Sequence, residues 1–379
     1  MNEEKNIRAA SEVIEDAAAR SVSELTLGNA DETNAILSEQ APAAQTLNEP
    51  LDANVKTLSP FMLVMKRFFR SRLSMVGLTL IILLFLFSFL GPVIFNRWGE
   101  TQTDYGGKEE IISVPVTVTD ADGNETEIIQ VTVAKQPINT LSPPSLKHWL
   151  GTDKAGMDVF TRIMYGGRIS LTISILVVLL ETVIGVILGG LAGYFGKWVD
   201  QVIMRIVDIF SCVPTLPLLL IAGSLLDAWK VDPSLRIYYL MVILTFLGWA
   251  GTARIVRGQI LYLREQEYMV AAEAMGLSTA RKIFKHLVPN VMPQLIVSMT
   301  LGLGSTILYE ASLSYLGLGV KAPYAAWGTM INIITEDVNV LQYNPWVWVP
   351  SGVLIVLAVL AFNFIGDGLR DALDPKMKR

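Results

Sequence analysis

Long apolar runs separated by polar segments are the main pattern of this 379-residue chain. A helix rises 1.5 Å per residue, so about 20 apolar residues cross the hydrocarbon core of a bilayer, which is about 30 Å thick. Most of the runs reach that length, and one is shorter. We therefore predict an all-α integral membrane protein with six transmembrane helices, at Leu73–Ile94, Ile169–Ala192, Val202–Leu226, Ile237–Thr252, Val291–Leu313 and Trp346–Ile365.

The composition agrees with a surface that largely faces lipid. The chain is 52% hydrophobic and 17% charged, whereas soluble domains carry about 25% charged residues. One cysteine, Cys212, and two distant histidines, His148 and His286, exclude a disulfide framework and a cysteine- or histidine-rich metal site. The net charge of −5 is unevenly spread and does not indicate a nucleic-acid partner.

Residues 1–58 form an acidic segment with 11 Asp and Glu against 4 Lys and Arg. With few aromatic residues, it cannot bury enough apolar surface to offset the entropy of ordering. We predict a mostly disordered cytoplasmic tail without a partner of its own. Because the segment holds no apolar run, we also expect no cleavable secretory signal.

A basic anchor and the first transmembrane helix share residues 59–95. The basic residues that directly precede the apolar run are Lys66, Arg67, Arg70 and Arg72. Such residues flank spans on the cytoplasmic side, so we place the N-terminus in the cytoplasm. Six spans return the chain to the same side, which predicts a cytoplasmic C-terminal tail at 366–379.

The long loop at 96–168 then lies outside the cell. Ile112–Thr119 and Glu127–Val133 have the alternating, β-branched character of strands, and Asp120–Asn124 between them is a strong turn signal. We predict a small extracellular β-hairpin between the first two transmembrane helices. The loop's Lys and Arg residues do not contradict this side, because long loops count little in the positive-inside rule.

The most informative segment is the cytoplasmic loop 253–289 within the helical core 169–365. Good helix formers fill Glu265–Met275, Gly276 can adopt the left-handed conformation that ends a helix, and Ser278 suits the start of a second helix. Pro289 marks the entry to the next span. The pattern predicts a helix–turn–helix on the cytoplasmic face. Small side chains on its first helix suit a groove in a soluble partner, and an ordinary interfacial helix is the alternative.

This segment resembles the EAA loop of ABC importer permeases, whose pattern is E-A-A, three residues, Gly, nine residues and I-x-L-P. Ala271, Ala272, Gly276 and Pro289 match the pattern. Val270 replaces the glutamate, and His286 and Val288 replace the isoleucine and the leucine. Glu273 or Glu267 would then have to substitute for the missing carboxylate. The resemblance implies that the ATPase-coupling loop uses Ala271, Ala272, Glu273, Gly276, Arg281 and Pro289.

Further motifs are similar to the C-type subunit of the oligopeptide/dipeptide permeases and together cover most of residues 60–379. They are Leu150–Asp153 with Gly156, Asp158, Arg162, Gly166–Arg168 and Ser170; Leu191–Gly196 with Val199 and Asp200; Glu310–Gly317; and Gly366–Pro375. The resemblance implies the fold of a type I ABC importer permease. It also implies a second homologous permease, two ATP-binding subunits, an extracytoplasmic peptide-binding protein and a peptide substrate. The protein would lie in the plasma membrane of a bacterium.

The chain itself lacks a phosphate-binding loop. The nearest approach is Gly196-Lys197, where Leu191 replaces the earlier glycine and Trp198 replaces the hydroxyl residue. We therefore expect no cofactor in this chain and no enzyme activity. ATP and Mg would be bound, and ATP hydrolysed, by the partner ATPase subunits.

Polar residues inside the predicted spans call for a reason, because ionisable groups in hydrocarbon cost about 2.5–3.5 kcal/mol each. Glu181, Asp208, Glu310 and Asn363 either line a translocation path or make polar contacts between helices. Arg205 lies three residues before Asp208, and we expect these two to pair on one helix face. Pro214 and Pro217 are expected to bend the third span, as a gate hinge or as a static kink.

Three other readings compete with a peptide permease. A self-powered carrier would need a broken helix at mid-membrane or a relay of carboxylates, and a membrane enzyme would need several catalytic groups at related depths. Neither accounts for the cytoplasmic helix–turn–helix. A permease of the same family for nickel or another small solute is the nearest alternative.

Overall fold

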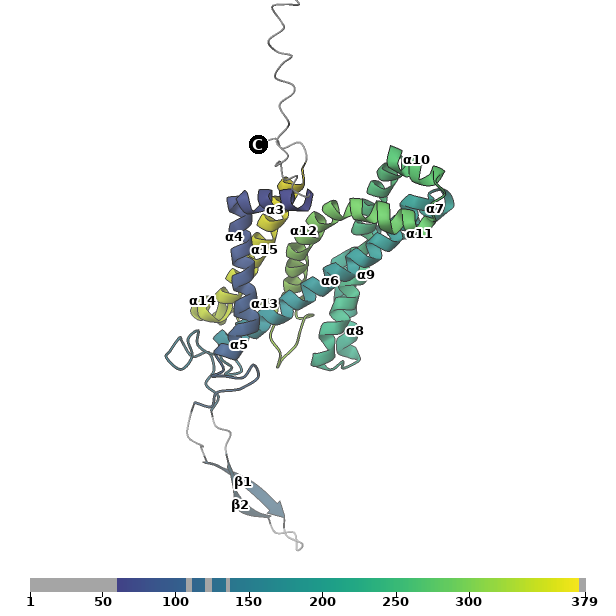
Figure 1. Cartoon of the computed structure of the whole chain (residues 1–379). Coiled ribbons are helices and arrows are strands. Elements are labelled where there is room, and N and C mark those ends of the chain that lie inside the picture. Colours follow the sequence, from purple (N-terminus) through teal and green to yellow (C-terminus); the bar gives the residue numbers. More distant parts are fainter. Residues whose placement is uncertain (1–59, 107–110, 120–124, 134–136, 375–379) are drawn as a thin grey trace, which may run out of the picture. The chain divides into compact units, whose positions relative to one another are not determined.

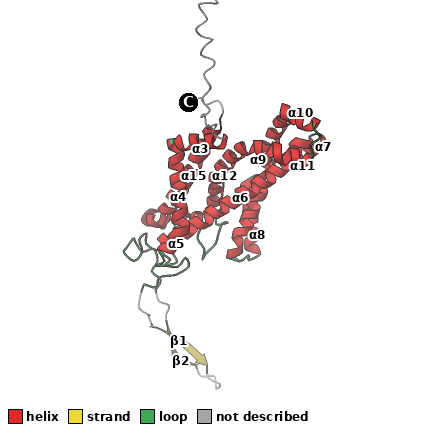
Figure 2. Ribbon diagram, viewed as in Figure 1, coloured by secondary structure: helices red, strands yellow, loops and turns green. Residues whose placement is uncertain are grey.

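The structure is a computed structural model that describes residues 60–106, 111–119, 125–133 and 137–374. The predicted acidic tail 1–58 and the last five residues lie outside these ranges. Figure 1 shows the order of the helices along the chain, and Figure 2 shows that helices make up almost all of the regular structure.

Within the described residues, five helices are long and apolar enough to cross a membrane, or six if one bent pair counts as a single span. The first span consists of α4, a π-helical turn η3 and the short α5. The spanning helices are α4 (Arg72–Phe85), η3 (Leu86–Leu90), α5 (Gly91–Ile94), α6 (Val159–Phe195), α7 (Lys197–Cys212), α8 (Thr215–Ala228), α9 (Pro233–Arg264), α12 (Val288–Tyr315) and α15 (Pro345–Leu373).

The bent pair is α7 and α8, which meet at an angle of 78°. Val213 and Pro214 between them are extended, with ψ of 124° and 111°. Proline lacks the N–H that would continue the helical hydrogen bonds. The predicted bend of the third span is therefore confirmed, and it lies at Pro214 rather than at Pro217, which lies inside α8.

Helices α6 and α9 run well past their apolar runs. Helix α6 begins at Val159, inside the segment assigned to the extracellular loop, because the Asp158 carboxylate caps it by accepting from the Thr161 N–H at 2.8 Å. Helix α9 continues to Arg264, so residues 253–264 are helical and not loop. Hydrophobicity marks the part of a helix that lies in lipid and says little about its extension into water.

A stripe of glycines brings α6 and α9 together. A Cβ added at Gly185, Gly189 or Gly193 would overlap atoms of α9, including the backbone of Ala253 and Arg257. These glycines are four residues apart and share one face of α6. Small residues at this spacing let two transmembrane backbones approach closely, and the pair forms the centre of the helical unit.

Shorter helices and two strands lie between the spans. Helix α3 (Pro60–Arg70) precedes the first span, and α13 (Trp327–Glu336) and α14 (Val338–Tyr343) connect α12 to α15. Strands β1 (Ile111–Thr119) and β2 (Glu125–Val133) pair antiparallel, with Ile111 opposite Val133 and Thr119 opposite Glu125. The predicted turn residues 120–124 lie outside the described residues, and the extracellular side of this strand pair stays a prediction.

Candidate functional site

The coupling segment, residues 265–289, connects α9 to α12 and contains a short helix, α10 (Glu267–Ala274). Gly276 follows with φ of 68°, in the left-handed region that side chains rarely adopt. Its N–H bonds to the Glu273 carbonyl at 2.9 Å, and the Leu277 N–H bonds to the Ala272 carbonyl at 3.2 Å. These two hydrogen bonds are the Schellman pattern, so the helix ends in a defined turn that depends on a glycine.

The sequence suggested that the second helix of the segment ends before Pro289. In the structure this helix continues through Pro289. Helix α11 (Thr279–Arg281) passes through a π-helical stretch, η4 (Lys282–Leu287), directly into α12. The Val288 N–H bonds to the Ile283 carbonyl, so the hydrogen-bond spacing widens just before the proline. Pro289 occupies the first turn of α12, where its missing N–H costs little. One helix therefore runs from the turn into the membrane, from Thr279 to Tyr315.

The two alanines of the motif face opposite sides. Ala272 and Met269 are buried against an apolar cluster of α9 and α12 that includes Ile260, Leu287 and Val291. Ala271 is exposed, so only one of the two can meet a partner directly. From the sequence we expected both alanines to contact the partner. Adjacent residues on a helix do not share a face, so only one of them can. Of the other predicted residues, Glu273, Gly276, Arg281 and Pro289 are exposed.

Although the coupling segment is rich in polar residues, several of its exposed side chains are large and apolar. Val270, Met275 and Phe284 are 60%, 72% and 72% exposed. Large apolar side chains concentrated on a short segment outside the spans indicate an interaction surface. These three residues were not among the predicted site residues. Their spacing around Gly276 becomes meaningful only when the turn folds the two helices together.

Charged side chains of the segment and of the end of α9 contact the ends of α6 and α7. Arg264 donates from Nη1 to the Tyr194 carbonyl at 3.0 Å, and Lys282 Nζ lies 3.8 Å from the Glu273 carboxylate and above the Tyr194 ring. A bidentate pair between Arg257 and Asp200 links α9 to α7 nearby. Sequence reasoning missed Arg264, Lys282 and Tyr194 as positioning residues, because their partners are distant in the chain.

The four polar residues proposed for the path do not gather at one place. Glu181 lines a cavity of about 250 Å³ between α6, α8, α9 and α12, together with Thr215, Ser305, Thr306 and Tyr309. Its carboxylate lies against Gly248 of α9, where a Cβ would overlap it. Asn363 lies instead beside Gly304 and does not line this cavity. Only Glu181 therefore has the surroundings of a path residue.

Glu310 and Asp208 have partners within the chain. Glu310 is 2% exposed and accepts from the Ser170 and Ser314 hydroxyls at 2.8 and 2.7 Å, which joins α12 to α6. Asp208 pairs with Arg254 of α9 at 3.2 Å. The expected pairing of Asp208 with Arg205 is therefore wrong, because the long side chain of Arg254 reaches the carboxylate from the neighbouring helix. Both contacts match the structural alternative, polar contact between helices.

On the other side of the spans, the loop before α6 and the first turn of α6 contain a buried charge network. The sequence motif included its members Asp153, Asp158 and Arg162 but not Asp104 and His148. His148, 1% exposed, places Nδ1 at 2.8 Å from Asp158 and Nε2 at 3.1 Å from Asp104. Burial raises the pKa of Asp104, but hydrogen bonds from Lys147, Asn139 and His148 outweigh it and lower that pKa to about 2. Beside these residues, Asp153 pairs with Arg162 at 3.2 Å. We call Asp104, His148, Asp153, Asp158 and Arg162 the outer cluster.

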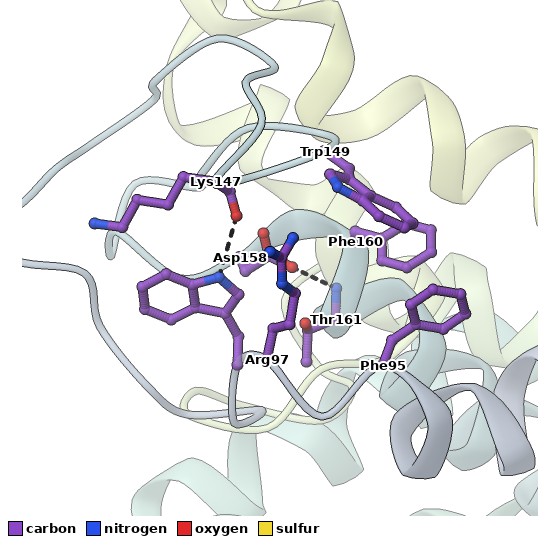
Figure 3. Close-up of a pocket in the computed structure, with 8 residues that line it drawn as sticks. Phe95, Arg97, Lys147, Trp149, Asp158, Phe160 and Thr161 are labelled. Atoms are coloured by element: carbon purple, nitrogen blue, oxygen red, sulfur yellow. Dashed lines mark hydrogen bonds between the residues drawn. The ribbon is translucent and has the colours of Figure 1, made fainter.

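Aromatic residues cover the outer cluster. Figure 3 shows the small cavity beside it, with Asp158 bonded to the Thr161 backbone and with Trp149, Phe160 and Phe95 on one side. Trp98 packs over the His148 ring at 4.5 Å between centroids and donates to the Lys147 carbonyl. Asp158 is both the N-cap of α6 and a partner of His148. The cluster therefore fixes the loop to the start of a span. Among the described residues, no group of three His, Cys, Asp or Glu side chains is arranged to hold a metal ion.

Comparison with known proteins gives consistent matches. A family profile described as "Binding-protein-dependent transport system inner membrane component" matches residues 185–379, and one described as "N-terminal TM domain of oligopeptide transport permease C" matches residues 59–108. The oligopeptide transport system permease protein OppC of Bacillus subtilis is 37% identical over 339 residues, covering 89% of this chain and 97% of its own. The dipeptide transport system permease protein DppC of the same organism is 36% identical over 83% of this chain and 85% of its own. A chain of the MetNI methionine ABC transporter aligns at 22% identity and a TM-score of 0.43, over 55% of this chain and 95% of that chain.

Proposed function

The chain belongs to the family of binding-protein-dependent transport permeases, and from this premise we propose that it is the permease subunit of an ATP-driven oligopeptide or dipeptide importer. It would form half of the translocation pathway, and a second, homologous permease would form the other half. The names of the relatives that cover most of the chain support peptides as the substrate class.

The observation that carries the proposal is the shape of the coupling segment. Helix α10 lies between two spans and ends in a turn fixed by Gly276, and Val270 of α10, Met275 of the turn and Phe284 of η4 are exposed around it. A short helix with an exposed apolar face suits a groove in a soluble protein. In this function the groove belongs to an ATPase subunit, and ATP and Mg are bound there and not in this chain.

The same segment suits the transmission of motion. One continuous helix runs from Thr279 to Tyr315, so a displacement of the turn moves α12 as a rigid body. Arg264 and Lys282 connect the turn to the end of α6 through Tyr194, so α6 would follow. Closure of the ATPases around ATP would thereby change access to the path between the two permeases.

The path itself is best represented by the cavity at Glu181. Hydroxyl groups of Thr215, Ser305, Thr306 and Tyr309 accompany the carboxylate there. A peptide backbone needs hydrogen-bonding partners when it leaves water, and a carboxylate suits its amino terminus. The bend at Pro214 lies next to Thr215, so movement of α8 relative to α7 would change the width of this cavity.

We place both termini and the coupling segment in the cytoplasm and the outer cluster on the external face. Two groups of basic residues flank the first span and the coupling turn, and the positive-inside rule places both groups on the cytoplasmic side. The groups are Lys66, Arg67, Arg70 and Arg72, and Arg264, Arg281, Lys282 and Lys285. An extracytoplasmic peptide-binding protein would then dock on the face formed by the outer cluster and helices α13 and α14.

The experiment that tests the proposal is affinity purification of this chain from mild detergent, with mass spectrometry of the proteins that accompany it. We expect a second permease and two ATPases, and peptide uptake in liposomes that requires ATP and a binding protein. A chain that purifies alone and transports solute without ATP would overturn the proposal in favour of a self-powered carrier. Uptake of nickel and not of peptides by the assembled complex would overturn the substrate class alone.

A further inference from the structure

Helix α3 has the side-chain distribution of a helix that lies on a membrane surface. Met62, Leu63 and Phe69 are 53%, 43% and 50% exposed, and Lys66 and Arg70 are exposed as well. Apolar and basic side chains that are exposed together on a helix next to a span favour the boundary between headgroups and acyl chains. This placement needs only that the chain spans a membrane.

The helix is held against the far end of the chain. Phe68, on its opposite face, is 6% exposed and lies beside Gly368 of α15. Arg67 donates from Nη1 to the backbone carbonyl of Asp374 at 3.2 Å. Two segments about 300 residues apart in sequence therefore meet at one end of the first and last spans (Figure 1).

A cavity of about 400 Å³ lies where they meet. Three of the residues that line it are arginines, a fourth carries a hydroxyl group, and two more are small. The lining residues are Arg67, Arg70, Ser71, Arg72, Gly368, Asp371 and Ala372. A Cβ at Gly368 would overlap Ser74, so this glycine lets α15 pack closely against the first span beside the cavity.

The charges in this cavity favour an anion. Three arginines and only one acidic residue, Asp371, line it. Within the part of the chain that the structure describes, no carboxylate lies within ion-pair distance of Arg70 or Arg72. Guanidinium groups bind phosphate through two parallel hydrogen bonds and are more weakly hydrated than ammonium groups. Two unpaired arginines beside a hydroxyl group form a receptor for a phosphate group.

We propose that this cavity binds the phosphate group of an anionic membrane lipid. The exposed Met62, Leu63 and Phe69 on the same helix provide an apolar surface for acyl chains, which a site for free phosphate would not need. The bound lipid would link α3 to the end of α15 and hold the first and last spans together. This site is separate from the coupling segment and from the cavity at Glu181.

The test uses the whole transporter, purified with its partner subunits in neutral detergent. Native mass spectrometry would follow its titration with phosphatidylglycerol, with phosphatidylcholine and with inorganic phosphate. Each arginine near an anionic lipid contributes roughly fivefold to binding. We therefore expect Arg70→Gln/Arg72→Gln to bind phosphatidylglycerol about 25-fold more weakly. Lys66→Gln removes a charge from the same helix but does not line the cavity, so it is expected to weaken binding by at most the roughly fivefold of one nearby charge.

Other outcomes overturn the proposal. If the double variant and Lys66→Gln lose the same affinity for phosphatidylglycerol, the effect is a diffuse attraction of charge and not a site. If phosphatidylcholine binds as tightly as phosphatidylglycerol, the cavity does not select an anionic lipid. Binding of inorganic phosphate without phosphatidylglycerol would show a site for a free anion. If the glutamine variant fails to assemble, Arg70→Lys/Arg72→Lys keeps the charge and removes the planar fork. Several-fold weaker binding of phosphatidylglycerol is expected for it, and unchanged binding would contradict the proposal.

Discussion

The coupling segment and the outer cluster are both polar regions between spans, yet they manage their side chains in opposite ways. In the outer cluster His148, Asp104 and Asp158 are buried and are paired with one another. In the coupling segment Glu273 is 79% exposed at the side chain and Met275 is 72% exposed. One region pairs its buried charged groups within the chain, and the other leaves both charged and apolar side chains exposed.

This difference indicates which region completes itself and which needs a partner. Buried charges are tolerated only when they are paired and hydrogen-bonded, and the outer cluster meets that condition within one chain. Exposed apolar groups such as Met275 and Phe284 become buried only when another protein covers them. Mutations should therefore affect stability in the outer cluster and transport in the coupling segment.

The largest effect is expected for Gly276→Val. Valine at φ of 68° is strained by about 1–2 kcal/mol, and the turn would change its angle to relieve the strain. Nothing lies within 4 Å of a Cβ at this position, so the effect comes from the backbone and not from a clash. We expect ATP-dependent uptake in vesicles to fall to background while the subunit still assembles.

Gly276→Asn serves as the matched control for that variant, because asparagine tolerates the left-handed conformation better than other residues with side chains. It should retain a large part of the uptake. Normal uptake by Gly276→Val would rule out the turn as a coupling element, and equal loss in both variants would assign the defect to the added side chain.

The second effect is expected for His148→Leu. Removal of the imidazole leaves Asp104 and Asp158 buried near each other without the group that lies between them. A buried acceptor that loses its hydrogen-bonding partner costs about 1–3 kcal/mol, and more when the acceptor is charged. We expect that loss in the free energy of unfolding, measured by denaturation of the purified transporter in mixed micelles.

Lys147→Gln is the matched control for His148→Leu. Lys147 also bonds to Asp104, at 2.7 Å, but its side chain is 57% exposed. Without Lys147, Asp104 keeps its hydrogen bonds to Asn139 and His148, and no carboxylate loses its buried partner, so this variant should lose less stability than His148→Leu. A His148→Leu transporter as stable as the Lys147→Gln transporter would mean that the outer cluster does not hold the loop to α6.

The contrast between the two regions also explains what the sequence could predict. Spans are local runs of apolar residues, and the turn at Gly276 is a local pattern of helix formers, glycine and a capping residue. The outer cluster joins positions 104, 148 and 158, and no periodicity connects these. Asp104 and His148 read as ordinary loop residues in the sequence, and the motif that contains Asp158 does not show which side chains its carboxylate contacts.

The same limit applies to the details of the coupling segment. The sequence identified Ala271 and Ala272 but not which of them faces inward, since that depends on the cluster around Ile260 and Leu287. It paired Asp208 with Arg205 on one helix, whereas Arg254 approaches from another helix. The role of the residues proposed for coupling stays a prediction, because their partner lies outside this chain.

The third effect is a dependence of stability on pH through Asp104. Its pKa in the folded protein is about 2, below the ordinary value of 3.8. A lowered carboxyl pKa gives stability that is fully present above the unfolded value and is lost as pH falls toward the folded value. The contribution is about 2 kcal/mol at neutral pH. We expect the difference in unfolding free energy between the unaltered protein and Asp104→Asn to shrink as pH falls from about 4 to about 2. A difference in unfolding free energy that stays constant over this range would show that ionisation of Asp104 does not stabilise the folded protein.

The smallest effect on stability is expected for Glu273→Gln. The Glu273 carboxylate lies 3.8 Å from Lys282 Nζ and is mostly in water, and such pairs contribute less than about 1 kcal/mol. If this carboxylate substitutes for the missing glutamate of the motif, uptake should fall several-fold while the unfolding free energy stays within that limit. Glu267→Gln removes a charge from the same helix and serves as its control. A loss confined to Glu267→Gln would assign the docking role to that residue, and a loss of stability in Glu273→Gln comparable to that in His148→Leu would remove the distinction between the two regions.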